Sequence, residues 1–156
     1  MFNVILAMDD NFGIGSNNDL PWRFSKDMKF FRTTTMNTDF FDDSIVIMGR
    51  KTMESLPKKF LPNRVNIVIS GNLNKNDNYI CVNSFEEALT KAYEINSKHS
   101  NNIWVIGGGQ VYNRALTHPD LNLIYCTQVE GEFDCDVFVT LPNVELIKNI
   151  QETDMN

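Results

Sequence analysis

The sequence predicts a single α/β domain with a mostly parallel central sheet flanked by helices. Short runs rich in Val, Ile and Leu recur along the chain, and their length suits buried strands better than helices. Segments with helical periodicity separate these runs, and strands that alternate with helices are typical of a parallel sheet. The chain has 156 residues and no low-complexity break. We therefore expect one domain, residues 1–156, that buries roughly two-thirds of the surface of its unfolded chain.

The expected elements follow each other closely except near the N-terminus, where residues 10–24 form a long loop rich in turn-forming residues. A loop of this length in a compact domain is usually functional or mobile. Ser84 and Glu87 predict a capping box at the start of one helix, and residues 130–136 form an acidic loop. The expected strands are residues 2–9, 44–48, 64–70, 79–82, 103–106 and 121–129, and the expected helices are residues 25–35, 49–56, 84–98 and 110–116.

Composition excludes several classes of protein. A hydrophobic content of 42% indicates a soluble globular chain, and the longest apolar runs are too short to cross a bilayer. No basic segment precedes the first apolar run, so we expect no signal peptide and a cytoplasmic location. The three cysteines lack CxxC spacing, and neither histidine lies at metal-ligand spacing. We therefore expect reduced thiols and no metal.

The distribution of charge indicates an anionic ligand. The net charge of −6 argues against nucleic acid or an anionic membrane as a partner. However, the segment from Arg50 to Arg64 holds five basic residues and only one acidic residue, Glu54. Such a segment usually forms a solvated basic surface, but in an acidic protein it also predicts a side of the molecule that receives an anion.

Two junctions between a strand and a helix carry glycine. The expected strand 44–48 leads into Gly49, Arg50, Lys51 and Thr52, and the expected strand 103–106 leads into a triple glycine. Free N–H groups at a helix start favour phosphate, and glycine lets a ligand approach the backbone closely. The spacing is not GxGxxG, so the ordinary dinucleotide-binding motif is absent.

Asp27 lies at an unusual place in the expected helix 25–35. With Phe24, Met28 and Phe31 it occupies positions of one helical face, which is otherwise apolar. Burying a carboxylate is unfavourable unless a polar group contacts it, so Asp27 is a candidate for binding a ligand. The alternative is structural: Ser25 is a good N-cap, and an aspartate in a first helical turn interacts favourably with the helix dipole.

Several short motifs follow one another from the N-terminus to about Pro142. They are Ile5, Leu6 and Ala7; Gly13, Ile14 and Gly15; Asp19, Leu20, Pro21 and Trp22; Asp27 and Phe31; residues 46–52; Arg64, Val65 and Asn66 through Ser70; Ile106 to Gly109 with Val111 and Tyr112; and Thr127. In this order they resemble the dihydrofolate reductase family.

The resemblance implies an eight-stranded, mostly parallel sheet, NADPH as hydride donor and 7,8-dihydrofolate as acceptor. Residues 44–100 would form the adenosine-binding part, residues 10–24 a lid over the nicotinamide, and the peptide between Gly107 and Gly108 would be cis. Asp27 would hold the pterin ring and favour its protonation, which comes by way of solvent. Thr127 would bond to Asp27 or its water, and Arg64 would bind the glutamate α-carboxylate of the substrate.

The resemblance also assigns sets of residues to the site. The catalytic set is Asp27, Leu20, Trp22 and Thr127. The substrate set is Ile5, Leu6, Asp27, Met28, Phe31, Ser55, Leu56, Leu61, Arg64, Ile106, Tyr112 and Thr127. The cofactor set is Ala7, Ile14, Gly15, Leu20, Gly49, Arg50, Lys51, Thr52, Ile69, Ser70, Gly71, Ile106, Gly108, Gly109, Gln110, Val111 and Tyr112. For most apolar members, ordinary core packing is the alternative role.

The sequence departs from the family pattern at several positions. Met53 replaces a frequent aromatic residue, and Gln110 and Gly71 replace side chains that help to bind phosphate in some members. Family chains continue past the position of Pro142 with a closing β-hairpin, but only residues 143–156 follow here, so the hairpin would be truncated. The chain could be naturally shortened, be part of a polypeptide fused to or associated with thymidylate synthase, or receive the strand from a partner.

Two other functions are consistent with parts of this pattern. A non-catalytic folate- or nucleotide-binding module would fit a truncated C-terminus. A related-fold pyrimidine reductase of riboflavin biosynthesis would share the fold, although its substrate has no need of the combination of Trp22 and Asp27.

Overall fold

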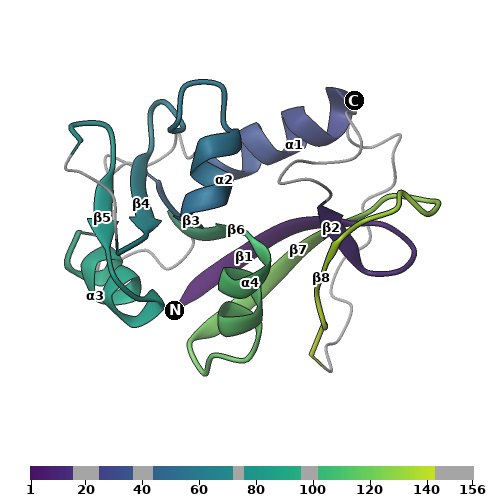
Figure 1. The fold of residues 1–156 in the computed structure, drawn as a ribbon. Coiled ribbons are helices and arrows are strands. Elements are labelled where there is room, and N and C mark those ends of the chain that lie inside the picture. The colour runs from purple at the N-terminus through teal and green to yellow at the C-terminus, as the bar shows by residue number, and fades with distance from the viewer. Residues whose placement is uncertain (16–24, 37–43, 72–75, 96–101, 143–156) are drawn as a thin grey trace.

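A computed structural model describes residues 1–15, 25–36, 44–71, 76–95 and 102–142, except for the side chains of residues 25–28. Its centre is a six-stranded sheet with the order β5-β4-β3-β6-β1-β7, and every pairing in it is parallel (Figure 1). This arrangement confirms the predicted α/β class. The strands are β1 (Phe2–Met8), β3 (Ile45–Gly49), β4 (Val65–Ile69), β5 (Ile80–Val82), β6 (Ile103–Gly107) and β7 (Leu121–Gln128).

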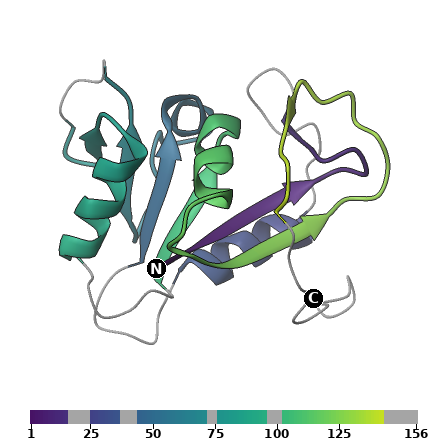
Figure 2. The same cartoon turned by 90° about the horizontal axis from the view of Figure 1, so that it is seen from below.

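The helices cover both faces of this sheet. They are α1 (Ser25–Thr35), α2 (Arg50–Ser55), α3 (Phe85–Ile95) and α4 (Gly109–Leu116). Figures 1 and 2 show α1 and α2 on one face and α3 and α4 on the other. None of the helices in the described part of the chain is long and apolar enough to span a membrane.

Alternation along the strands divides the core into two clusters. In β1, Phe2, Val4 and Leu6 belong to a cluster with α3 and α4, whereas Ile5 belongs to a cluster on the opposite face. Successive side chains of a strand point to opposite faces, so a central strand must be apolar throughout. We call the group on the α1 side the α1-face cluster. It consists of buried Ile5, Val46, Met48, Met53, Val68, Trp104 and Ile106, with Phe30, Phe31, Leu56, Leu61, Tyr79 and Tyr125 packed against them.

The predicted cap of α3 is present in a modified form. The Glu87 N–H donates to Ser84 Oγ at 3.1 Å, as a capping box requires. The Glu87 carboxylate accepts from the Asn83 N–H at 2.8 Å, one residue before the cap residue. Helix α3 is assigned to Ile95, and the remainder of the predicted helix, residues 96–98, lies outside the described residues.

The prediction of an unbroken loop over residues 10–24 is wrong for its described part. Gly13–Gly15 forms strand β2, which pairs antiparallel with β8 (Val137–Phe138). The Asp136 N–H extends this pairing by donating to the Gly15 carbonyl at 2.8 Å. A three-residue strand between glycines has no periodic pattern, and its partner is distant in sequence, so residues 10–15 alone gave no sign of it.

The strands are distributed differently from the single eight-stranded sheet that the resemblance implies. In the described residues, six strands form the central sheet, and β2 and β8 form a separate two-stranded ribbon. The ribbon lies beside the ends of β1 and β7 (Figure 1). The expected truncated hairpin involves residues 143–156, which lie outside the described residues.

Candidate functional site

An apolar wall lies on the α1 side of the sheet. Five residues of the predicted substrate set belong to the α1-face cluster. Ile5 and Ile106 are buried strand residues, and three partly exposed side chains pack against that cluster. These three are Phe31, Leu56 and Leu61. The structure therefore brings together five residues that were predicted to contact one aromatic ligand, and we call these five the apolar wall. They come from two strands, from α1 and from the segment after α2.

Arg64 is held at the end of α1. Its Nη1 donates to Thr35 Oγ1 at 2.9 Å, and its Nε donates to the Pro62 carbonyl at 3.0 Å. The Thr35 hydroxyl donates to the Phe31 carbonyl at 2.8 Å, so the whole chain of contacts is anchored in the helix. Burial lowers the pKa of Arg64, and the positive charge of Arg32 lowers it further. The guanidinium nevertheless keeps its proton, because an arginine in a protein does not titrate near neutral pH.

Asn66 fixes the segment that carries Arg64. Its side-chain oxygen accepts from the Leu61 N–H at 2.8 Å. Its side-chain nitrogen donates to the carbonyls of Leu61 at 2.8 Å and of Arg64 at 2.9 Å. Asn66 is only 2% exposed. A buried amide that satisfies three backbone groups makes this segment rigid before any ligand binds.

Ala7 and Thr127 lie side by side across the pair β1 and β7. The register places Ile5 opposite Tyr125 and Ala7 opposite Thr127. Ile5 and Tyr125 both take part in the α1-face cluster, and residues two apart in a strand share a face. The side chains of Ala7 and Thr127 therefore point to the same side of the sheet as the apolar wall.

Two glycines at the strand–helix junctions allow close packing: Gly49, the last residue of β3, approaches α4, and Gly109, the first residue of α4, approaches β8. A Cβ on Gly49 would lie 3.3 Å from Val111 Cγ2, and one on Gly109 would lie 2.5 Å from Val137 Cγ1. The Gly107–Gly108 peptide is cis, as the resemblance implied. Packing within the protein therefore accounts for part of the requirement for glycine here, independently of any ligand.

The start of α4 suits an anionic group. Its N-cap is Gly108, which provides no side-chain hydrogen bond, and the first turn contains no acidic residue. The first N–H groups of the helix therefore keep their donor capacity for a ligand. Gln110 is exposed. These features fit the pyrophosphate of a dinucleotide.

Tyr112 stabilises the backbone next to this junction. Its hydroxyl lies 2.8 Å from the Ile5 carbonyl oxygen and 2.7 Å from the Ile106 carbonyl oxygen. The phenol has one proton, so it can donate fully to only one of the two at a time. Tyr112 packs in the cluster on the α3 and α4 side. Its position therefore indicates that it supports the site from behind the sheet.

Other predicted cofactor residues lie around α2 and β4. Arg50, Lys51 and Gly71 are exposed, while Thr52 and Ser70 are half-buried. The Arg50 Nε donates to Glu54 Oε1 at 2.6 Å, and both side chains are 49% exposed. A phosphate at this place would compete with Glu54 for Arg50.

Some predicted residues do not join the apolar wall. Leu6, Ile14, Ile69 and Val111 take part in the cluster on the α3 and α4 side. Leu6 is separated from Ile5 because neighbouring residues of a strand face opposite ways. Ser55 is exposed and donates to the Thr52 carbonyl at 2.7 Å, which closes the end of α2. The residues Leu20 and Trp22, together with the side chains of Asp27 and Met28, lie outside the described part of the chain.

Comparison with known proteins agrees with this geometry. The family model described as "Dihydrofolate reductase" matches residues 1–156. A dihydrofolate reductase of Drosophila melanogaster is 41% identical over 144 residues, which is 88% of this chain and 78% of that protein. A putative dihydrofolate reductase of Caenorhabditis elegans is 38% identical over 160 residues, covering 99% of this chain and 85% of that protein. The chain belongs to the dihydrofolate reductase family.

A further relative has a second activity in its name. The bifunctional dihydrofolate reductase-thymidylate synthase of Daucus carota is 37% identical over 151 residues, which is 90% of this chain but 28% of that protein. Membership of the dihydrofolate reductase family implies a small-molecule substrate and a nicotinamide cofactor, and the predicted family is confirmed.

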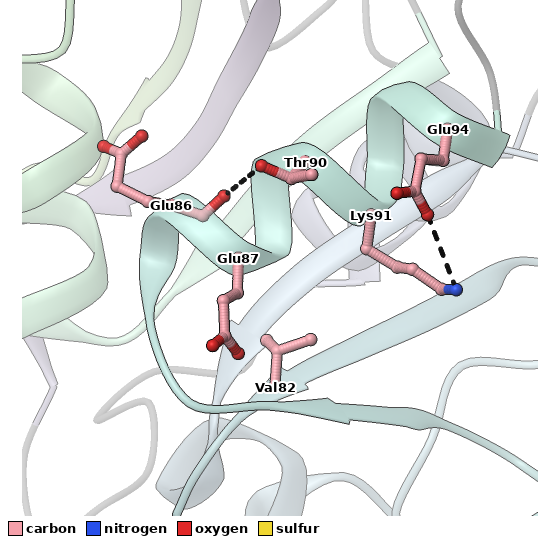
Figure 3. Close-up of a pocket in the computed structure, with 6 residues that line it drawn as sticks. All are labelled: Val82, Glu86, Glu87, Thr90, Lys91 and Glu94. Atoms are coloured by element: carbon pink, nitrogen blue, oxygen red, sulfur yellow. Dashed lines mark hydrogen bonds and ion pairs between the residues drawn. The ribbon is translucent and has the colours of Figure 1, made fainter.

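A pocket elsewhere on the molecule does not suit such ligands. It has a volume of about 380 Å³ and lies between α3 and β5. Figure 3 shows its lining, which contains three glutamates and one lysine. The lining residues are Val82, Glu86, Glu87, Thr90, Lys91 and Glu94, and none of them belongs to the predicted site. An acidic pocket repels the phosphates and carboxylates of the ligands that the dihydrofolate reductase family uses.

The sequence prediction missed two polar residues beside the site, Thr35 and Asp9. Thr35 ends α1 and is completely buried, and Asp9 follows β1 and is 2% exposed. An aspartate directly after a buried strand is a weak signal of a side chain that turns back to bind backbone. Three threonines end α1 in sequence, and nothing in their order distinguishes Thr35 as the partner of Arg64.

Proposed function

We propose that this chain is an NADPH-dependent dihydrofolate reductase, which converts 7,8-dihydrofolate to 5,6,7,8-tetrahydrofolate. The observation that carries the proposal is the apolar wall together with Arg64, which Thr35 links to Phe31 of that wall. Such a wall suits the pterin and benzoyl rings, and the guanidinium suits a carboxylate tail. Thr35 and Asn66 hold Arg64 and its segment before the substrate arrives, which reduces the entropy that binding must overcome.

In this reaction the pterin gains a hydride at a ring carbon and a proton at the neighbouring ring nitrogen. A bound reduced nicotinamide would supply the hydride. Asp27 is our candidate for the group that holds the amino group and ring nitrogen at the far edge of the pterin. A carboxylate there favours the protonated ring, and the proton arrives by way of solvent. Thr127 would orient Asp27 or its water, and Ala7 beside it leaves room for the nicotinamide.

Preference for NADPH over NADH would come from the basic segment. Arg50, Lys51, Thr52 and Ser70 are the candidates for holding the 2′-phosphate, and the N–H groups that begin α4 are the candidates for the pyrophosphate. Exclusion of water by residues 10–24 would complete the site; of these, residues 16–24 lie outside the described residues.

The first experiment is turnover by the purified chain. We expect loss of NADPH absorbance that requires dihydrofolate, and slower turnover with NADH. A folded chain that binds NADPH and an antifolate without turnover would contradict the proposal and favour the non-catalytic binding module.

The second experiment substitutes the candidate carboxylate. We expect Asp27→Asn to keep the fold and NADPH binding but to lose about 100-fold or more in turnover at neutral pH, the range of general acid catalysis. Part of the loss should be recovered at low pH, where the substrate is already protonated. Asp77→Asn, the same change at an exposed turn residue, is the matched control. Normal turnover of Asp27→Asn would mean that Asp27 is only a first-turn helix residue.

A fused or associated thymidylate synthase is a further prediction, suggested by the name of the carrot relative. Mass analysis of the natural protein would test whether this chain is part of a longer polypeptide.

A further inference from the structure

Asp9 is a buried carboxylate to which the proposed reaction assigns no role. It directly follows β1 and is 2% exposed. Its Oδ1 accepts from the N–H groups of Asn11 at 2.9 Å and Gly13 at 2.8 Å. Its Oδ2 accepts from the Phe133 N–H at 3.2 Å and from the Cys135 thiol at 3.5 Å. One side chain thus joins two segments that are more than a hundred residues apart in sequence.

Further contacts connect the same two segments on either side of Asp9. The Asp10 N–H donates to the Gly131 carbonyl at 3.0 Å, and the Gly131 N–H donates to Asp10 Oδ2 at 2.9 Å. The Val139 N–H donates to the Phe12 carbonyl at 3.0 Å. On the facing segment, the partners of Asp9, Phe133 and Cys135, lie between Gly131 and Val139, and the Asp9 side chain is only 2% exposed. The hydrogen bonds of its carboxylate are therefore the part of this connection that solvent can least replace.

The carboxylate is stabilised by hydrogen bonds alone. Among the described residues no basic side chain forms an ion pair with it, and the charged residues of the facing segment, Glu130, Glu132, Asp134 and Asp136, are all acidic. Burial by itself would raise the pKa of Asp9, but the N–H groups of Gly13, Phe133 and Asn11 and the Cys135 thiol lower it below its usual value. Asp9 is therefore an anion at neutral pH.

The space around this carboxylate is closed by Gly13. A Cβ on Gly13 would lie 2.5 Å from Cys135 Cβ and 3.0 Å from Asp9 Oδ1. Real Cβ atoms do not approach other atoms so closely, so only glycine lets the two segments meet at this distance. Because of this close approach, Gly13 lies directly against the Asp9 carboxylate, and its N–H donates to Oδ1.

The held segment continues directly into the predicted nicotinamide site. Gly13 begins β2, whose next two residues, Ile14 and Gly15, belong to the predicted cofactor set. Ala7, two residues before Asp9, lies opposite Thr127. We propose that Asp9 is a positioning residue for hydride transfer, because its carboxylate fixes β2 against residues 133–135. The role rests on the proposed function, since it assumes that β2 borders the bound cofactor.

The test compares the chemical step in wild type and in two variants. Asp9→Asn keeps the shape but points an NH₂ group at N–H or S–H donors. Asp9→Ser keeps an acceptor for the Asn11 and Gly13 N–H groups, as serine does in turns, but is too short to reach Phe133. Enzyme saturated with NADPH is mixed with limiting dihydrofolate, and the rate per antifolate-titrated site is recorded with NADPH and with its deuterated form.

We expect both variants to transfer hydride about 10- to 100-fold more slowly per active site, the range that small misplacements of reacting groups cost. The isotope effect on steady-state turnover should rise towards its single-turnover value as the chemical step becomes rate-limiting. Hydrogen–deuterium exchange should become faster at the Phe133 amide. If Asp9→Asn fails to fold, Asp9→Ser provides the same test.

A control variant separates positioning from general effects. Asp134→Asn removes the same charge from the acidic segment that faces Asp9, at an exposed residue whose φ of 51° asparagine tolerates. We expect the wild-type rate from this variant.

The outcomes distinguish this role from the proposed function. If wild type turns over but Asp9→Asn and Asp9→Ser transfer hydride at the wild-type rate per site, with only lower stability, Asp9 is structural and the positioning role is wrong. If wild type itself does not turn over, the proposed function is wrong and the role falls with it. In that case, hydrogen exchange at Phe133 still reports whether Asp9 joins the two segments.

Discussion

Asp9 and Arg64 are two charged side chains that the fold holds in opposite ways. The Asp9 carboxylate accepts four hydrogen bonds, two at each oxygen, and is 2% exposed. Arg64 is half-buried, and its described contacts use one donor on Nε and one on Nη1. A carboxylate has about four acceptor sites, whereas a guanidinium has five N–H donors. Among the described residues, the Asp9 carboxylate therefore has all its acceptor sites in use, whereas Arg64 does not have all its donors in use.

The difference indicates what each group is for. A buried charge whose hydrogen bonds are all made within the protein can only hold other parts of the protein in place. A charged side chain that uses some of its N–H donors to bond to the protein is held in place. Its remaining donors can then bind a ligand with little loss of side-chain entropy. The comparison predicts that changes at Arg64 affect ligand affinity, whereas changes around Asp9 affect stability and the chemical step.

The largest expected effect is on substrate affinity in Arg64→Leu. Hydrogen bonds to a charged group contribute about 1.5–3 kcal/mol, so we expect KM for dihydrofolate to rise about 10- to 100-fold. The unfolding free energy should change far less, because the lost protein contacts are only partly buried. Arg114→Leu, the same substitution at an exposed position of α4, is the control. Steady-state kinetics and urea unfolding check this, and an unchanged KM would mean that Arg64 is a surface strand-end arginine.

The next effect concerns stability around Asp9. Gly13→Ala would place a methyl group against Cys135, and overpacking of this kind costs about 1–3 kcal/mol. We expect urea unfolding to show a loss in this range. Gly71→Ala is the matched control, because a Cβ there would lie 3.9 Å from Asn83 Oδ1, an ordinary contact.

A second substitution makes this test specific. Cys135→Gly removes the Cβ that would collide with the new methyl group. If the collision is the cause, Cys135→Gly should cost less stability in the Gly13→Ala background than in wild type. Equal costs in the two backgrounds would show that the two positions are independent.

Periodicity predicted the fold because the central strands and α1 are regular. The expected helix 25–35 agrees with α1 at both ends, and the expected strand 64–70 contains β4 with one residue to spare on each side. The ribbon of β2 and β8 was not predictable in this way. Its strands have three and two residues, and the contacts that Asp9 and Gly13 make beside it with residues 133–135 are between segments that no local pattern connects.

Parts of the candidate site were also predictable, although by motif more than by geometry. The sequence alone marked Gly107 and Gly108 as a junction, but the cis peptide came from the family resemblance. Leu6 shows a limit of motifs, because its place beside Ile5 in sequence puts its side chain on the opposite face of the sheet. The link from Thr35 to Arg64 spans 29 residues and depends on how α1 packs against the sheet, which sequence spacing does not give.

The smallest expected effect is that of Thr35→Val, which removes the hydroxyl between α1 and Arg64 while keeping a similar shape. The substrate keeps the charge of Arg64 and loses only part of its positioning, so the effect should be smaller than in Arg64→Leu. We expect KM for dihydrofolate to rise about 2- to 10-fold, which corresponds to about 0.5–1.5 kcal/mol, with kcat nearly unchanged. Thr90→Val, which removes the hydroxyl that donates to the Glu86 carbonyl on the exposed side of α3, is the matched control. In an Arg64→Leu background the effect of Thr35→Val on KM should vanish, because the hydroxyl then has no guanidinium to hold. If the two effects on KM were instead additive, Thr35 would act on the substrate independently of Arg64. Fixing of the guanidinium by Thr35 would then not contribute to substrate affinity, and this part of the contrast with Asp9 would be wrong.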